Sequence, residues 1–510
     1  MASEQIYEEI IPEHFKKAAP NQVAIEALLQ PATDVKIAKI LTISCESEIL
    51  SYEALAGEAR YNGRANFKVL FVDLDGATNS MDYNADFSDK IMDDAIMPSG
   101  ELMLEANTLD TDTISVTQND IRISAAIEIS CKVVVKERLN LIKQTLDDVY
   151  TQTDELEYDV ISGKGAETFY ISEEFEPKDN IVNILLCEAA NITSDVTAGL
   201  DCVIYNGMID LNVIYTTENG LIKNENFTLE YSQEINAPGA RIEDKVVYVI
   251  KINSFTMTLM DDLSGSHKLL KGEFKMQAEC RTVAITKAVA IIDAFSVSKE
   301  IKITGESIDF TKFFGTKRFD ETIEGSANLG DELPSVDKVI CLTSSKVQVA
   351  NIFNEGNKLT IEGVLHTGII YWNNEYETRN SVSVELPYSL TVKCELPEGM
   401  LEFDGNACIM RISARPKKGE VELSAQVKFC INVYCKKVGY YIKDIELGEI
   451  KISRESAIAV YITKQGEKLW DVAKALHTTP QNILMNNPNL KEPLPSGERI
   501  LIYRQISADI

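Results

Sequence analysis

The side chains that could carry out chemistry are few and scattered along the chain. Only four histidines are available for acid-base catalysis or metal binding, at His14, His267, His366 and His477. His366 aligns with Asn66 and Asp210 on the polar face of a predicted strand, which favours a solvated side chain over a ligand or a catalyst. His477 is predicted at the end of a helix. The histidines therefore do not predict an active site.

A run of aspartates is the second candidate for chemistry. Its members are Asp73, Asp75, Asp82, Asp86, Asp89, Asp93 and Asp94. Carboxylates are Ca²⁺ ligands, but the similar segments at 216–235 and 372–390 lack them, and their spacing differs from that of an EF-hand. We interpret the run as the charged edge of a hairpin, which resists pairing with other strands.

Motifs of known catalytic classes are missing from the sequence. It has no GxSxG, HExxH, Walker or dinucleotide-binding pattern. Pairs of Asp and Glu could serve a glycosidase, but nothing distinguishes them from solvated carboxylates. We therefore predict a protein without enzymatic activity, cofactor or metal.

The composition is that of a globular chain with a strongly acidic balance. Of the 510 residues, 45% are hydrophobic and 25% charged, and the net charge is −29. A nucleic-acid partner is disfavoured because it requires clustered cations, and acidic membranes are disfavoured too. The start lacks the pattern of a signal peptide, and no apolar run is long enough to span a bilayer. These features predict a cytoplasmic protein without membrane insertion, whose ten cysteines, none in a CxxC pair, are reduced thiols.

Three similar segments predict tandem β-rich domains. They are centred on Gly63, Gly207 and Gly363, which lie 144 and 156 residues apart. Apolar or small residues occupy every second position around each glycine, the pattern of a strand with one face on a core. The glycine itself predicts a bend or a close backbone approach. A turn and a second alternating run follow, with Tyr83, Phe87 and Ile91, then Phe227, Tyr231 and Ile235, then Val382, Leu386 and Leu390.

Each segment has a second β-rich half, at 126–135, 274–284 and 423–435. A short tag then leads out of each, Asp148-Val149-Tyr150, Asp293-Ala294-Phe295 and Asp444-Ile445. One helix is predicted in this region, at 137–147. The expected fold is mainly β, with three sandwich-like domains at 1–147, 148–292 and 293–455 and a small βααβ domain at 456–505.

The last of these domains resembles the LysM module. The resemblance rests on YITKQGEKLWDVA at 461–473, TPQNIL at 479–484, NNPNL at 486–490, and then Leu494, Gly497 and ILI at 500–502. Leu469, Val472, Ala473 and Leu476 form an apolar helical stripe, and Thr479 before Pro480 predicts a helix N-cap. LysM modules bind N-acetylglucosamine polymers at two loops, and in one of them this chain has Glu467-Lys468 where the family usually has Asp-Thr.

The candidate binding residues lie in those two loops and at the start of the first helix. They are Gln465, Gly466, Glu467, Lys468, Leu469, Trp470, Asn487, Pro488, Asn489 and Leu490. Trp470 is one of two tryptophans and could instead pack inside the module. The other, Trp372, is predicted on the outer face of its strand, as a contact candidate.

Three β-rich repeats followed by a LysM module resemble the SPOCS-domain spore coat morphogenetic proteins of the SipL type. The resemblance implies a non-enzymatic scaffold in the mother-cell cytoplasm, at the forespore surface. It would tether the spore coat by binding a polymerising morphogenetic ATPase through the LysM module. The alternative is a cell-wall protein that binds peptidoglycan or N-acetylglucosamine polymers, with the repeats as spacers.

Overall fold

The structure, a computed structural model, describes residues 4–503 except residues 33, 262–267, 330–332, 418–419 and 452–457. Residues 449–451 are described by their backbone alone. His267 and both ends of the predicted domain 456–505 lie outside the described residues. The described residues form 23 strands and two short helices, so the predicted mainly β fold is confirmed.

Strand pairing divides the strands into three consecutive units. Unit 1 contains β1 (Ile6–Ile10), β2 (Glu13–Lys17), β3 (Asn21–Leu29), β4 (Ile37–Leu55), β5 (Glu58–Asp73), β6 (Thr78–Met92), β7 (Leu102–Val116), β8 (Ile121–Lys136) and β9 (Leu139–Gln144). Its strands pair antiparallel as β4-β5-β6, as β2-β8-β3 with β7 beside β8, and as β1-β9. Apolar residues of the two larger sheets form one buried core.

Units 2 and 3 have the same connectivity with fewer, longer strands. Unit 2 contains β10 (Val149–Phe175), β11 (Ile181–Ala198), β12 (Cys202–Thr217), β13 (Ile222–Asn236), β14 (Lys245–Asp261) and β15 (Lys268–Ser296). Unit 3 contains β16 (Lys299–Asn328), β17 (Lys338–Glu355), β18 (Lys358–Asn373), β19 (Thr378–Lys393), β20 (Met400–Lys417) and β21 (Glu420–Lys451). The sheets are β11-β12-β13 and β10-β15-β14, then β17-β18-β19 and β16-β21-β20.

The long first strand of units 2 and 3 is interrupted in unit 1. Pro12 lies between β1 and β2, and Pro20 lies just before β3. Because proline cannot donate a ladder hydrogen bond, it is tolerated between strands and breaks the counterpart of β10 and β16 into three pieces. β15 continues through the predicted boundary at 292/293 and ends at Ser296.

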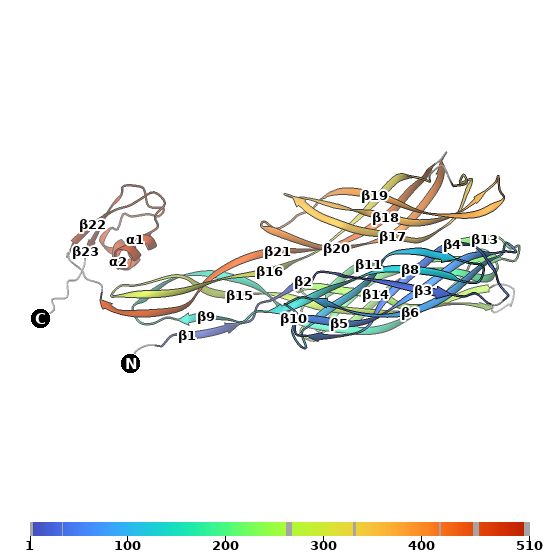
Figure 1. The fold of residues 1–510 in the computed structure, drawn as a ribbon. Coiled ribbons are helices and arrows are strands. Elements are labelled where there is room, and N and C mark those ends of the chain that lie inside the picture. The colour runs from blue at the N-terminus through green and yellow to red at the C-terminus, as the bar shows by residue number, and fades with distance from the viewer. Residues whose placement is uncertain are drawn as a thin grey trace.

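Each unit extends beyond its sandwich as a two-stranded ribbon. The ribbons are β1 with β9, residues 149–160 of β10 with 284–296 of β15, and residues 299–310 of β16 with 437–451 of β21. Figure 1 shows the sandwiches together at one end of an elongated molecule and the ribbons extending toward the other. The C-terminal unit lies at the ribbon end, with β22 (Ile458–Ile462), α1 (Leu469–Ala475), α2 (Pro480–Asn486) and β23 (Arg499–Tyr503).

Buried apolar side chains from all three units meet in a series of clusters, which we call the axial core. Each cluster takes residues from every unit: Leu70, Ile214 and Ile370; Phe15, Val247 and Phe313; Leu139, Leu156 and Phe310; Ile142, Ile291 and Ile442. The last two clusters lie between the ribbons. The three units therefore share these apolar clusters in addition to their separate cores.

The predicted helix at 137–147 is wrong, because β9 occupies residues 139–144. Leu139 and Leu141 are buried in the axial core on one face of this strand. β1 supplies the pairing partners of β9 from the other end of the unit. Leucine-rich sequence favours a helix locally, but pairing and burial between distant segments outweigh that preference.

The three inward glycines are sites of close approach, as predicted. Each faces an aromatic residue of the next strand: Gly63 faces Phe87, Gly207 faces Tyr231, and Gly363 faces Tyr388. A Cβ on Gly63 would lie 2.3 Å from Cζ of Phe87, and one on Gly207 would lie 2.6 Å from the Tyr231 hydroxyl. The ring covers the space that a side chain would need.

In unit 3 the aromatic counterpart is Tyr388 and not Leu386, which corrects the spacing taken from the sequence. The turn between β18 and β19 is one residue longer than the turn between β12 and β13. Trp372 lies opposite Arg379 in unit 3, whereas its counterpart Thr216 lies opposite Ile222 in unit 2. Leu386 also faces inward, at the next inward position along the strand.

The three tags are not equivalent either. Asp148 precedes β10, whereas Asp293 lies within β15 and Asp444 within β21. The latter two share one local geometry, in which the carboxylate accepts the N–H of the following residue at 2.9 Å. Asp293 and Asp444 are therefore structural counterparts near the ends of their ribbons.

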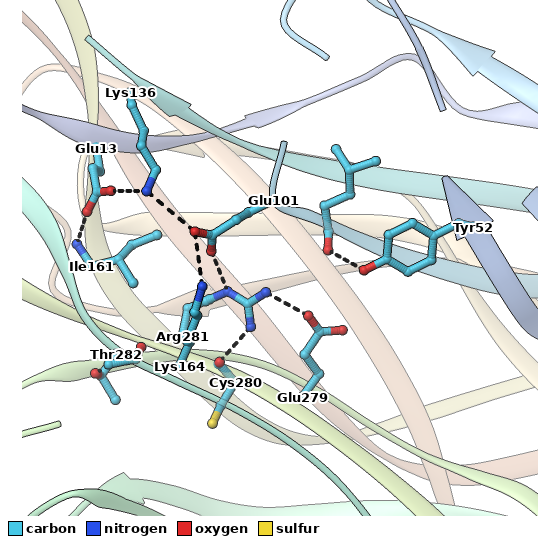
Figure 2. A network of polar contacts seen from close by, with 12 residues as sticks. Glu13, Tyr52, Glu101, Lys136, Ile161, Lys164, Glu279, Cys280, Arg281 and Thr282 are labelled. Carbon is cyan, nitrogen blue, oxygen red and sulfur yellow. Dashed lines mark hydrogen bonds and ion pairs between the residues drawn. The ribbon is translucent and has the colours of Figure 1, made fainter. Parts of the chain in front are cut away.

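Ion pairs join the units beside the axial core, and Figure 2 shows one such network. Glu101 of unit 1 lies 3.3 Å from Arg281 of unit 2, whose guanidinium also lies 2.9 Å from Glu279. Glu13 pairs with Lys136 at 2.9 Å and accepts the N–H of Ile161 at 2.6 Å. The acidic chain thus places basic side chains where its units meet.

We predict that Gly363→Val destabilises unit 3 by about 1–3 kcal/mol or more, because overpacking forces neighbouring groups apart. A Cβ there would lie 1.9 Å from the carbonyl oxygen of Gln348. Adding Tyr388→Ala should not restore stability, since the carbonyl remains in place. Domain-resolved proteolysis and melting measure this, with Ser389→Val on the exposed face of β19 as the control. Equal melting of the Gly363 and Ser389 variants would contradict it.

A second prediction concerns Asp404 of unit 3, which pairs with Lys132 of unit 1 at 2.5 Å. Burial acts to raise the pKa of Asp404, but Lys132 and Lys17 outweigh it and lower the pKa to about 2. Because its folded-state pKa is lowered, the pair stabilises the protein above pH 3.8 and loses this effect as the pH falls through about 2.

Asp404→Asn should therefore cost about 3–5 kcal/mol at neutral pH, because it leaves a buried cation unpaired. Urea unfolding of this variant is compared with Glu422→Gln, which breaks the exposed Lys417–Glu422 pair and should cost far less stability. If both variants lose a similar amount of unfolding free energy, the buried pair contributes no more to stability than the exposed pair does.

Candidate binding surface

The C-terminal unit is built around a small apolar core. Val472 and Ala473 of α1 are fully buried against Ile483 of α2 and Ile500 of β23. Thr479 caps α2 as predicted, because its hydroxyl accepts the N–H of Asn482 at 3.0 Å and Pro480 takes the first helical position. This core positions the two loops that contain the candidate binding residues.

The first loop, at 465–468, projects into solvent except for one side chain. Gln465, Gly466 and Lys468 are exposed, and Gly466 has a φ of 84°, which favours glycine. The Glu467 carboxylate turns back and accepts the Lys464 N–H and the Tyr461 hydroxyl, both at 2.7 Å. The hydrogen bond from the Lys464 backbone lowers the pKa of Glu467. Glu467 therefore shapes the loop and is not a free ligand.

The second loop lies beside the first and divides into structural and exposed residues. The Leu469 N–H, at the start of α1, donates to Glu492 at 2.7 Å, which joins the end of the first loop to the segment that follows the second loop at 487–490. Asn487 is structural, because its amide donates to the Ile483 and Leu501 carbonyls at 2.8 and 2.7 Å and accepts the Leu501 N–H at 2.8 Å. Pro488 and Asn489 are exposed, whereas Leu469 and Leu490 belong to the core.

Trp470 does not face these loops freely, because it contacts the end of β15. Its indole N–H donates to Asp293 at 2.8 Å, and its ring meets Phe295 edge-on at a centroid distance of 4.9 Å. Lys474, one turn further along α1, lies 2.5 Å from the same carboxylate. His477 follows α1, as predicted, with its ring Nδ1 3.3 Å from the Ser296 carbonyl oxygen.

The electrostatics of this contact favour ionised Asp293. Partial burial acts to raise its pKa, but the hydrogen bonds from Lys474 and Trp470 and the charge of Lys474 outweigh that effect and lower the pKa. Sequence reasoning identified Trp470 but missed Lys474, Asp293 and Phe295 as its partners. The available signals were the Asp-Ala-Phe tag and the spacing of four residues between Trp470 and Lys474.

The other candidates from the sequence are not brought together. His366 is half-buried, less solvated than predicted, with Nδ1 3.3 Å from Glu385. Trp372 is half-buried too, so its predicted exposure is wrong. In the aspartate run, Asp73 accepts hydrogen bonds from the N–H groups of Asp75 and Ala77 in its turn. Within the described residues no group of three or more His, Cys, Asp or Glu side chains is arranged to hold a metal ion.

Comparison with known proteins finds one match. Residues 180–260, from β11 to β14 of unit 2, match the family model described as SipL, SPOCS domain. This supports a relation of the chain to the SPOCS domains of SipL. No curated protein and no solved structure matches the chain. Of the two helices in the described part of the chain, neither is long enough to cross a membrane.

We predict that Asn487→Ala destabilises the C-terminal unit by about 1 kcal/mol, since it leaves the partly buried Leu501 N–H without its partner. Asn489→Ala, at an exposed position of the same loop, should change stability by less than about 0.5 kcal/mol. Proteolysis of the full chain, with cleavage read in the C-terminal unit, measures both. If the Asn487 variant is as resistant as the Asn489 variant, Asn487 has no structural role.

Proposed function

We propose that the protein is a non-enzymatic scaffold of spore coat assembly. In this proposal units 1 to 3 are three SPOCS repeats and the C-terminal unit is a LysM module. The observation that carries it is the SPOCS match within unit 2, together with the same strand order in units 1 and 3. The protein works in the mother-cell cytoplasm, at the forespore surface.

The module binds a polymerising coat ATPase and so tethers the coat to the forespore. Two features support a protein partner. The exposed loop residues include Lys468, a cation that suits an acidic or carbonyl-rich protein surface. The axial core joins the three repeats, so the module is carried at one end of a long body, which suits a tether.

Binding of N-acetylglucosamine polymers is the second candidate function. The exposed residues Gln465, Gly466, Pro488 and Asn489 of the two adjoining loops favour it, because the family binds sugar at these loops. A sugar chain is neutral, so its binding should not depend on the charge of Lys468. The two candidates can therefore be separated with a single charge reversal.

We predict that Lys468→Glu weakens capture of the coat ATPase by about three- to tenfold, as expected for a like charge placed at an interface. The measurement is a pull-down of the tagged full chain from sporulating cells, with quantification of the ATPase. Lys338→Glu, the same charge change at an exposed position of β17 in unit 3, is the control.

Calorimetric titration of the full chain with chitin oligomers completes the test, and we expect little binding. Tight saccharide binding that is insensitive to Lys468→Glu, with ATPase capture unchanged, would replace the scaffold by the cell-wall function. Reproducible hydrolysis of glycans or nucleotides, lost on mutation of a carboxylate, would refute the non-enzymatic assignment.

A further inference from the structure

The end of β15 contacts the C-terminal unit through a carboxylate and an aromatic platform. Asp293 takes two donors from one face of α1, the indole N–H of Trp470 and the ammonium of Lys474. Phe295 is buried between the Trp470 ring and the Tyr150 ring, which stacks on it at 5.7 Å. Polar and apolar contacts thus hold the same helix.

The contact crosses from one unit to another. The C-terminal unit follows β21 of unit 3 in the sequence, with residues 452–457 between them, yet α1 contacts β15 of unit 2. It thereby links the ribbons of units 2 and 3, in addition to the apolar cluster that they share.

The counterpart position in unit 3 is unsuited to the same contact. There the carboxylate of Asp444 accepts the Tyr7 hydroxyl at 3.1 Å. Phe295 and its partner Tyr150 are replaced by Glu446 and Lys302, which form an ion pair at 3.1 Å. Unit 2 therefore offers a carboxylate beside an aromatic pair, and unit 3 offers a carboxylate beside two charges. This difference explains why α1 contacts β15 and not the ribbon to which its own unit is joined.

We propose that the end of β15 is a docking site for α1, and that the docked contact is a latch on the C-terminal unit. While α1 is docked, the indole N–H of Trp470 is occupied by Asp293 and its ring is in contact with Phe295. In this inference the coat ATPase binds Trp470 in addition to the exposed loop residues, so it competes with β15 and must open the latch. The second half of this inference rests on the proposed function, and the docking itself does not.

The docking is tested by the fluorescence of Trp470 in a full-length Trp372→Phe background, where it is the one remaining tryptophan. Asp293→Lys and Lys474→Asp should each shift its emission to the red and remove its protection from acrylamide quenching. Asp293→Asn keeps an oxygen that can accept the indole N–H and loses only the charge, so it should shift the emission less than Asp293→Lys, which a variant misfolded by any change at this position would not do. Asp444→Asn, at the counterpart position, is the control and should leave the emission unchanged.

Unchanged emission in Asp293→Lys and Lys474→Asp, or an emission of Asp293→Asn as far to the red as that of Asp293→Lys, would overturn the latch. Capture of the coat ATPase from sporulating cells tests the competition. Asp293→Lys should increase capture, and Asp293→Asn should increase it less. Capture that is unaffected by Asp293→Lys while fluorescence shows an open latch would overturn the competition but not the docking. Loss of capture in every variant and in the original chain would count against the proposed function instead.

Discussion

The axial core is the interaction on which the rest of the structure depends. A two-stranded ribbon is at best marginally stable in water, because one of its faces has nothing to pack against. Leu139, Leu156 and Phe310 come from three different ribbons and remove that face from water together. No single ribbon can reach this state, so the ribbons of all three units must assemble as a set. Their assembly in turn carries the end of β15 to the place where α1 contacts it.

Ion pairs between the units determine how the units are placed against one another. The chain carries −29, so the assembly of three acidic units is opposed by their mutual repulsion. Lys132 and Arg281 lie at contacts between units, and each pairs with one carboxylate of another unit. A buried pair adds little net stability compared with apolar packing, but a misaligned register would leave its charges unpaired at a large cost. We interpret these pairs as determinants of the relative register of the units, with the apolar clusters providing the driving force.

The sequence predicted what depends on local pattern and missed what depends on distant partners. The alternation of apolar and polar residues around Gly63 and its counterparts identified the strands, because a strand with one buried face has an apolar residue at every second position. A glycine at one of these inward positions indicated the close approach. The residues at 137–147 look helical in isolation, and only β1 and the other ribbons make them a strand. The one-residue difference before Tyr388 lies in a turn, where register is not visible from alternation alone. At the candidate site the exposed loops followed from the LysM resemblance. The roles of Asp293 and Lys474 did not, because they arise from a contact of 181 residues in sequence separation.

The contact between Tyr7 and Asp444 has a consequence for synthesis of the chain. The two residues are 437 positions apart, so β1 has a partner in β21, a strand that is synthesised much later. At about 5–20 residues per second, β1 waits roughly 20–90 s before β21 exists. During that time the apolar side of the ribbon formed by β1 and β9 lacks its contacts with the ribbon of unit 3, although the sandwich of unit 1 can already fold. Completion of the ribbon end is thus a late, whole-chain event, and a truncated product would be left with exposed strand edges that invite aggregation.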